Sequence, residues 1–543
     1  MKRDVVTRGS ESACQPRSGF VLAVITIAIV LLSLAAYNYS GTMLVEHEAT
    51  AMGGRDVTAR TAAESAIEFA ATRILERDYD DTIDLYNDPD VFRAQLLLDS
   101  SVDRGRVRYT IVAPDETNTS TGSIRFGLGN ENAKFNINRL LELDALESAL
   151  PAEEQLGLVY LATSSIPNMT DDIIDAILDW LDSDEDRRPG GAESNEYEGL
   201  SVPYPCKNGP MDSIDELLKV QGVTPDLFYG EDANHNGILD ANENDGEQTP
   251  PFDNADGILD LGWKDYLTAR SRERNTTPDG EEKININMGE MTSLYDAIEE
   301  EFGEEAASYI VAVRLAGTEY MTPGTPEAES GIQDQISRND IDLTVVSTYQ
   351  FTSIYQLIGG PSNPTKMLTG VDQSFESPWP EDAGTLLNVL PDLERMLTTT
   401  DDAYIEGRIN VNQARLEVLT VLPGLALDVP ADLPDAILSA RPPIDLQSSS
   451  SSITARRNTA AWILAEGLVD LETLRNIGPY ITTGGDVYRF QAIGHFDAGG
   501  PSTRLEAMID ATEYPPRILS VRDLTSLGRG YHPNMLIPIE SSQ

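Results

Sequence analysis

The sequence predicts an α+β protein in which a long N-terminal helix packs on an antiparallel sheet and a large, mainly helical insertion interrupts that sheet. Three observations predict this class. An apolar run near the N-terminus continues into a helical stripe of alanines. Strand-like alternation occurs early in the chain and returns only near its end. Between about 131 and 480 the pattern is mainly helical, with acidic loops.

Length, charge and residue counts limit the classes of function that this chain can have. The 543 residues suggest about three to four domains. Acidic residues number 90 against 39 basic ones, a net charge of −51. This charge argues against nucleic acid and anionic lipid as partners. It favours a chain that stays soluble at high concentration or one that binds cations. Two cysteines and four scattered histidines supply little for a disulfide framework, a zinc site or acid–base chemistry, so an enzyme is the weaker hypothesis.

The first predicted element is a transmembrane helix over 20–38. The apolar run 20–37 would extend about 27 Å as a helix, enough to cross a bilayer core. Basic residues precede the run within 1–19, so this end stays in the cytoplasm and the remainder is exported. No second span follows. The sequence therefore predicts a single-pass inner-membrane protein with most of its mass in the periplasm.

A small residue, Gly19, stands before the apolar run, directly ahead of Phe20. A secretory signal would place its cleavage site after the run. A cut between Gly19 and Phe20 would remove a leader, 1–19, and keep the membrane helix, which resembles the processing of type IV prepilins by prepilin peptidase. Most prepilins carry a glutamate five residues into the mature chain, where this sequence has Val24. A signal anchor that is never cut is the alternative.

The helix is predicted to continue beyond the membrane, within a segment 39–130 that also holds the first strands. Small and apolar residues recur at three- and four-residue spacing, which would let the helix lie close on a sheet. These residues are Ala59, Ala62, Ala63, Ala66, Ile67, Ala70 and Ile74.

Alternating segments predict five strands, two early and three late in the chain. They are 106–112, 122–126, 487–493, 504–509 and 517–521. Strands at both ends of a long helical stretch indicate one sheet, which the segment 481–543 completes. A separate C-terminal domain is the alternative.

The insertion contains a threefold repeat. Copies of an apolar–Asn–apolar–Asn pattern at 133–138, 282–287 and 407–412 each precede a helical segment. They predict three helical modules, 131–281, 282–400 and 401–480. The alternating side chains would anchor a short extended entry to the core, and the second Asn of each copy is expected to cap the helix that follows. The repeat is therefore interpreted as structural rather than catalytic.

The clearest local motif, 232–243, matches an EF-hand-type calcium loop at every ligand position. Its predicted ligands are Asp232, Asn234, Asn236, the carbonyl of Ile238, Asp240 and Glu243, with Gly237 at the turn. Long flanking helices are not evident, so the prediction is of the loop alone. An Asx-rich turn without metal is the alternative.

A second acidic loop, 252–260, shares the core of this motif and offers Asp256 and Asp260. It is a weaker candidate, because Phe252 and Trp263 stand where the first and last ligands belong. Residues 171–260 hold 24 acidic against 4 basic side chains, a density that would repel itself without cations.

A third acidic segment spans 179–193. Its paired carboxylates could indicate a glycosidase or metal hydrolase, but no histidine partner or apolar pocket is evident to tune them. A cation-binding or solvated loop is the favoured interpretation.

Together these features resemble the K-type minor pseudopilins of type II secretion systems (general secretion pathway protein K family), which also lack the early glutamate. The matching segments are Gly19-Phe20, 133–138, 179–184 with 189–193, 214–222, 408–414 and 422–425. The resemblance implies a pilin-like head with helix-hairpin-helix or SAM-like modules, bound calcium, and a place at the pseudopilus tip beside the I- and J-type minor pseudopilins. It also implies calcium ligands at Asp182, Asp184 and Glu193. The chain departs from the family in its extra module around 283–400 and its EF-type loop.

Other functions remain open at this point. The Leu422–Leu425 hairpin is typical of helix-hairpin-helix DNA-binding modules, which the acidic charge disfavours. A membrane-anchored calcium-dependent enzyme would need a nucleophile–base pair that is not evident. A type IV pilus minor pilin, or a membrane-anchored calcium-binding assembly protein, is the nearest alternative.

Overall fold

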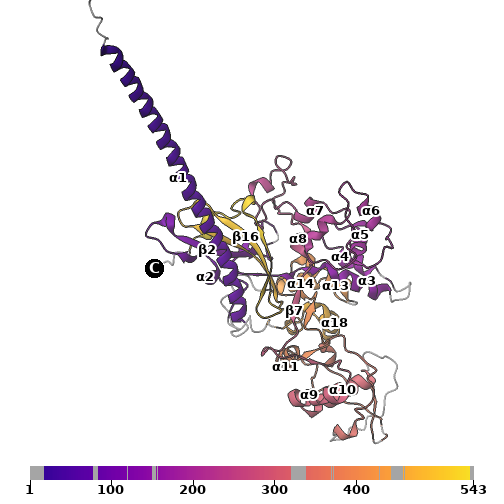
Figure 1. Cartoon of the computed structure of the whole chain (residues 1–543). Helices are drawn as coiled ribbons and strands as arrows, with labels where there is room; N and C mark the ends of the chain where they lie inside the picture. The colour runs from indigo at the N-terminus through magenta and orange to yellow at the C-terminus, as the bar shows by residue number, and fades with distance from the viewer. Residues whose placement is uncertain are drawn as a thin grey trace, which may run out of the picture.

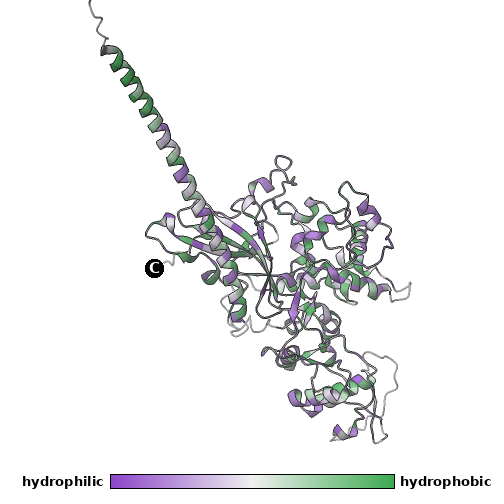
Figure 2. Cartoon of the chain, in the orientation of Figure 1, coloured by the Kyte–Doolittle hydropathy of each residue, from purple (hydrophilic) through white to green (hydrophobic). Residues whose placement is uncertain are grey.

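The structure is a computed structural model that describes residues 18–538, except 78–82, 119, 149–154, 156, 319–337, 369, 371, 427–428, 442–456 and 458. The first 17 residues of the expected leader thus lie outside the described residues. Helix α1 (Ser18–Arg77) extends from the head as a single rod (Figure 1). Its far half is apolar (Figure 2), and within the described chain it alone is long and apolar enough to cross a membrane. The predicted N-terminal apolar helix is confirmed.

Strands from both ends of the chain form one antiparallel sheet in the order β1-β2-β15-β16-β17. Two short strands complete it, β3 beside β2 and β4 beside β15. Because β15 pairs with β2 on one side and β16 on the other, the early and late strands share one core. The α+β fold class is confirmed. The strands are β1 (Gln95–Leu98), β2 (Val107–Pro114), β3 (Ile124–Arg125), β4 (Gly129–Asn130), β15 (Val487–Phe496), β16 (Thr503–Asp510) and β17 (Arg517–Asp523).

The sheet has two differently used faces. Apolar side chains of β15 such as Phe490 and Ala492 pack against the alanine stripe of α1, whose members are buried. The helix lies so close that a Cβ at Gly494 would stand 1.9 Å from the Ala59 carbonyl oxygen. Small residues on both partners therefore permit the contact, as the alanine spacing predicted. The opposite face carries polar side chains and receives the insertion.

The close packing of α1 on the sheet can be tested by enlarging one of its buried residues. Ala66 is fully buried between α1 and the sheet, so Ala66→Leu is expected to destabilise the head by about 1–3 kcal/mol through overpacking. The thermal midpoint of the full chain in detergent measures the effect. Ala51→Leu makes the same change at an exposed position of α1 and should leave the midpoint nearly unchanged. Equal effects of the two substitutions would contradict the packing.

The insertion consists of three consecutive modules. Each opens with an Asn-x-Asn strand and closes with a two-residue strand, Leu-Thr or Ile-Thr, that pairs with it in parallel. The pairs are β5 (Phe135–Asn136) with β6 (Leu267–Thr268), β8 (Ile284–Asn285) with β11 (Leu397–Thr398), and β13 (Ile409–Asn410) with β14 (Ile481–Thr482). The closing strands were not predicted.

Helices fill the space between these strands. The first module holds α3 (Leu140–Ser148), α4 (Leu158–Thr163), α5 (Asp171–Leu181), α6 (Ser194–Glu198), α7 (Pro225–Tyr229) and α8 (Trp263–Tyr266). The second holds α9 (Met291–Phe302), α10 (Glu304–Ala316) and α11 (Ala383–Met396). The third holds α12 (Leu416–Leu419), α13 (Leu422–Leu425), α14 (Leu433–Ala440), α17 (Trp462–Ala465) and α18 (Leu471–Ile477).

Minor elements complete the chain. Short antiparallel pairs join β7 (Arg272–Arg274) with β12 (Tyr404–Glu406) and β9 (Thr365–Lys366) with β10 (Asp372–Gln373). Two short helices, α2 (Pro89–Phe92) and α19 (Pro533–Leu536), accompany the sheet.

The predicted role of the second Asn in each repeat is wrong. The first Asn makes the local bond: Asn136 Oδ1 accepts the backbone N–H of Asn138 at 3.1 Å, and the other two copies repeat this contact at 2.8 and 2.9 Å. The second Asn instead donates its Nδ2 to carbonyls later in its own module. Asn138, for example, reaches the carbonyls of Met211 and Ala269. These bonds tie the start of each module to later segments of the same module.

Candidate metal centres

Acidic side chains gather where α5 ends. Asp179 lies in the last turn of α5 and Asp182 is its C-cap. Both positions face the negative end of the helix dipole, so they favour a nearby positive charge. Arg188 supplies one, donating to Asp179 at 2.9 Å and to Asp182 at 2.5 Å.

The Pro-Gly-Gly turn brings Glu193, the N-cap of α6, back onto this helix end. A Cβ at Gly191 would lie 2.0 Å from Asp179 Oδ2, so only glycine allows the approach. Ligand oxygens of Asp182, Asp184 and Glu193 lie within 4.8 Å of one another. In the described chain no other group of three acidic, histidine or cysteine side chains gathers its ligand atoms so closely.

Several oxygens of this group are buried without a hydrogen-bond donor, which fits a cation site. The side chain of Glu193 is 1% exposed, and neither of its oxygens has a hydrogen-bond partner among the described residues. Asp182 Oδ1 is also buried without a partner. Burial, followed by the neighbouring carboxylates of Asp179 and Asp182, raises the pKa of Glu193 to about 7. A buried carboxylate without a donor is costly unless a cation binds it, and a hard divalent ion prefers oxygen ligands.

The EF-type loop forms a compact turn after α7. Asp232 accepts the backbone N–H groups of Asn236 and Gly237 at 3.0 and 2.7 Å, and Glu243 accepts two others at 3.0 Å each. Asn234 Oδ1 is buried and has no partner among the described residues. Burial raises the pKa of Asp232 to about 6 and that of Glu243 to about 7, where nearby carboxylates add to the effect.

The remaining predicted ligands complete the same turn. Asp240 Oδ2 receives the amide groups of Asn234 at 2.6 Å and Asn236 at 3.0 Å. The backbone N–H of Ile238 donates to Asn236 Oδ1 at 2.7 Å. The side chains of the predicted ligands thus lie in one hydrogen-bonded turn, and the unpartnered Oδ1 of Asn234 leaves an oxygen available to a cation. Carboxylate and amide oxygens of this kind fit calcium.

The weaker acidic loop is a structural copy of the first. Asn254 donates to Asp260 at 3.2 Å, and Asp256 accepts the N–H of Ile258 at 2.8 Å, as in the EF-type loop. Both loops also bond to the β2–β3 connection, through Leu239 to Thr121 and Leu259 to Ser120. The N–H of Asp260 donates to Glu231 at 3.2 Å, as that of Asp240 does to Glu243, but Asp256 and Asp260 themselves are exposed. This copy is the poorer fit to a cation.

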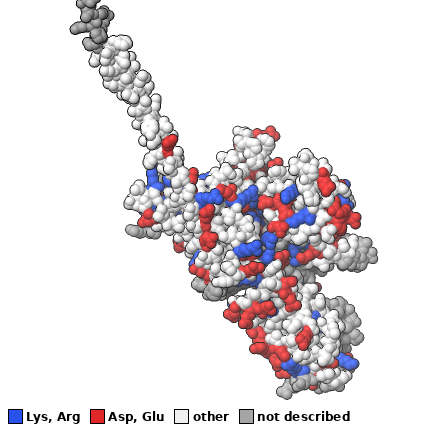
Figure 3. Space-filling model, viewed as in Figure 1, with Lys and Arg blue, Asp and Glu red and all other residues white. Residues whose placement is uncertain are grey.

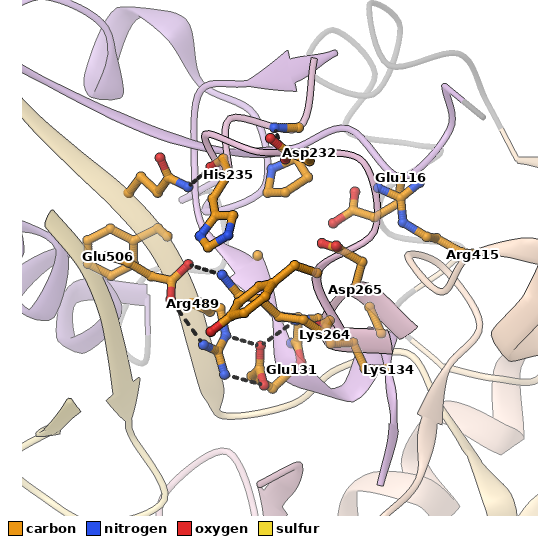
Figure 4. A pocket seen from close by; sticks show the side chains of 18 residues that line it. Glu116, Glu131, Lys134, Asp232, His235, Lys264, Asp265, Arg415, Arg489 and Glu506 are labelled. Atoms are coloured by element: carbon orange, nitrogen blue, oxygen red, sulfur yellow. Dashed lines mark hydrogen bonds and ion pairs between the residues drawn. The ribbon is translucent and has the colours of Figure 1, made fainter. Parts of the chain in front are cut away.

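A cavity of about 80 Å³ separates the EF-type loop from the polar face of the sheet. Asp232 and His235 of the loop line one side, and charged side chains of the sheet line the other (Figure 4). Arg489 donates to Glu131 at 2.8 Å and pairs with Glu506 at 3.4 Å, which in turn pairs with Lys264.

This network was not predicted from the sequence. Arg489 and Glu506 alternate with apolar residues on their strands, which is equally typical of a solvated face. Their burial follows only from the docking of the insertion. The role of Arg188 was not predicted either; besides Asp179 and Asp182 it pairs with Asp144, which comes from the separate helix α3.

Acidic side chains are widespread on the visible surface of the insertion, whereas the outer part of α1 shows few charges (Figure 3). The Leu422–Leu425 hairpin is buried, and Gly424 lies against α4. This face of the hairpin is therefore not available to DNA.

Part of the chain matches the model of a known protein family. Residues 133–229 match the family model described as Type II secretion system (T2SS), protein K. The match includes α3 to α7 and the Asp182–Glu193 turn.

Two relatives carry the name Type II secretion system protein K. The one from Pectobacterium carotovorum subsp. carotovorum is 32% identical over 111 residues, 20% of this chain and 34% of the relative. The one from Aeromonas hydrophila is 28% identical over 224 residues, 40% and 62% respectively. The chain thus aligns with less than two thirds of either relative. A chain from the crystal structure of the GspK-GspI-GspJ complex of enterotoxigenic Escherichia coli shows 12% identity and a TM-score of 0.32, covering 86% of this chain and 97% of that one.

Proposed function

Because residues 133–229 match the model of the type II secretion system protein K family, we propose that this chain is a non-enzymatic minor pseudopilin of that family. We propose further that it caps the tip of the pseudopilus and supports protein export across the outer membrane. Its partners would be the I- and J-type minor pseudopilins. It would be anchored in the inner membrane by α1, with the head in the periplasm.

One observation carries this proposal: α1 and the insertion occupy opposite faces of the same sheet. The alanine stripe joins the apolar rod rigidly to the sheet, as expected of a subunit that packs through its N-terminal helix. The insertion covers the other face and widens the head far beyond the helix (Figure 1). A subunit stacked above it would be obstructed, so the terminal position is favoured.

Processing fits the same role. Prepilin peptidase would cut between Gly19 and Phe20 and leave α1 with an apolar N-terminus. Val24 stands where most prepilins have a glutamate that pairs with the terminal amine of a neighbour. A terminal subunit has no neighbour above it whose terminal amine would need such a glutamate.

Calcium is the proposed ligand of two sites. Asp182, Asp184 and Glu193 would form the first, supported by the unpartnered oxygens of Glu193 and Asp182. The EF-type loop, with Asp232, Asn234, Asn236, Ile238, Asp240 and Glu243, would form the second. When bound, the ion neutralises clustered carboxylates, and the chain's own residues supply the folded frame around it.

The position in the filament can be tested by labelling. A tag on the exposed insertion, in cells expressing the whole secretion system, should bind gold at one end of isolated pseudopili. A tag on the major pseudopilin is the matched control and should be labelled along the length. Labelling of the insertion tag along the filament would contradict tip capping.

A further inference from the structure

The EF-type loop lacks the long helices that ordinarily frame such a loop, and the sheet takes their place. The carbonyl oxygen of Asn234 accepts a hydrogen bond from Arg504 of β16. The carbonyl oxygen of His235 accepts one from Gln491 of β15 at 2.6 Å. Two strands far from the loop in sequence thus hold its backbone at consecutive residues.

The C-terminal segment holds the loop from a third direction. Asn236 donates its side-chain amide to the Gly530 carbonyl at 2.5 Å. The neighbouring Tyr531 is buried and donates its hydroxyl to Gln491 at 2.8 Å. The same glutamine therefore bonds both the loop and the C-terminal segment.

Both sheet residues are buried and committed to these contacts. Arg504 is 1% exposed and Gln491 is 8% exposed. Each alternates on its strand with a residue that packs on α1, Phe490 beside Gln491 and Leu505 beside Arg504, so both project from the opposite face of the sheet. Gln491 also lines the cavity that the insertion covers. Neither Arg504 nor Gln491 carries a ligand oxygen of the predicted loop, so each would act through the backbone it holds.

We infer that Arg504 and Gln491 are positioning residues of the calcium loop, and that calcium binding in turn fixes the C-terminal segment 524–538 on the sheet. This inference rests on the proposed calcium site. Residues that orient the ligands of a metal site commonly contribute 10- to 100-fold to its affinity. Coupling between two binding events is reciprocal, so the ion must strengthen docking as much as docking strengthens ion binding.

The test measures calcium binding by the full chain in detergent. Glu193→Gln is introduced first, so that calorimetry reports the loop site without the site at α5. In this background, Arg504→Met and Gln491→Leu should each weaken calcium binding roughly 10-fold or more. Arg504→Lys, which keeps a donor, should recover part of the loss. Arg517→Met is the matched control, because Arg517 lies on the exposed edge strand β17, outside both the loop and the segment 524–538, and it should bind as the background does.

Hydrogen exchange supplies the second readout. Amides of 524–538 should exchange faster when calcium is chelated, and this difference should shrink in Arg504→Met and Gln491→Leu. If both variants bind calcium with unchanged affinity, the positioning role is wrong while the calcium site stands. If the Glu193→Gln background binds no calcium, the proposed loop site itself is wrong.

Discussion

Replacing Arg489 with methionine is expected to destabilise the head by about 3–5 kcal/mol, because it leaves buried carboxylates without their main partner. The side chain of Glu131 is 1% exposed and that of Glu506 is 8% exposed, and Arg489 bonds both. Hydrogen exchange of the β15 and β16 amides in the full chain measures the loss. Arg517→Met, on the exposed edge strand β17, should change exchange little. An Arg489 variant as protected as the wild type would contradict the network.

The same network predicts that the contact between the insertion and the sheet is sensitive to acid. Burial alone would raise the pKa of Glu131, but the charges of Arg489 and Lys134 more than offset it and lower the pKa to about 2. A carboxyl group with a depressed folded pKa stabilises above its unfolded value of about 4.5 and loses that contribution as pH falls toward 2. Docking of the insertion on the sheet should therefore weaken across this range. Protection of β15 that stays constant from pH 5 to pH 2 would contradict the assignment.

Replacing Glu193 with glutamine is expected to stabilise the first module without calcium and to remove most of its stabilisation by calcium. Without calcium, the variant should be about 1–3 kcal/mol more stable than the wild type, because it removes a buried carboxylate that lacks a partner. With calcium at about 100 times its dissociation constant, the wild type should gain about 2.7 kcal/mol and the variant little of it. Trp180, which packs on Tyr197 beside the site, reports the thermal midpoint by its fluorescence.

Glu198→Gln provides the matched control for this prediction. Glu198 is exposed and lies five residues beyond Glu193, so its substitution should leave both midpoints unchanged. If calcium stabilises Glu193→Gln as much as the wild type, Glu193 is not a ligand. If calcium changes neither midpoint, the α5 site does not bind it.

Much of the fold could be predicted because its signals are local. The alanine stripe of α1 and the alternation of β15 and β16 are visible in the sequence and occur as predicted. Each Asn-x-Asn repeat is visible too and opens a module, although its second Asn does not cap the following helix. Strand β1 escaped prediction because Leu96, Leu97 and Leu98 do not alternate with polar residues. The closing strands of the modules escaped it because two residues carry no periodic pattern.

The same distinction between local and non-local signals applies to the candidate sites. The EF-type loop and the Asp182–Glu193 turn are each continuous in sequence, so their ligands could be proposed from spacing or resemblance. The contacts that frame them are not continuous. Gln491 and Arg504 reach the EF-type loop only because the insertion folds back on the sheet, and this placement is a tertiary property that no local pattern encodes.

The central claim, that this chain is a pseudopilin, is tested most directly by the N-terminal residue of the membrane-extracted protein. Mass spectrometry would compare cells with and without prepilin peptidase. The claim predicts a chain that begins at Phe20, N-methylated, only when the peptidase is present. An intact Met1 in the presence of the peptidase, or a cut beyond Tyr37, would contradict it.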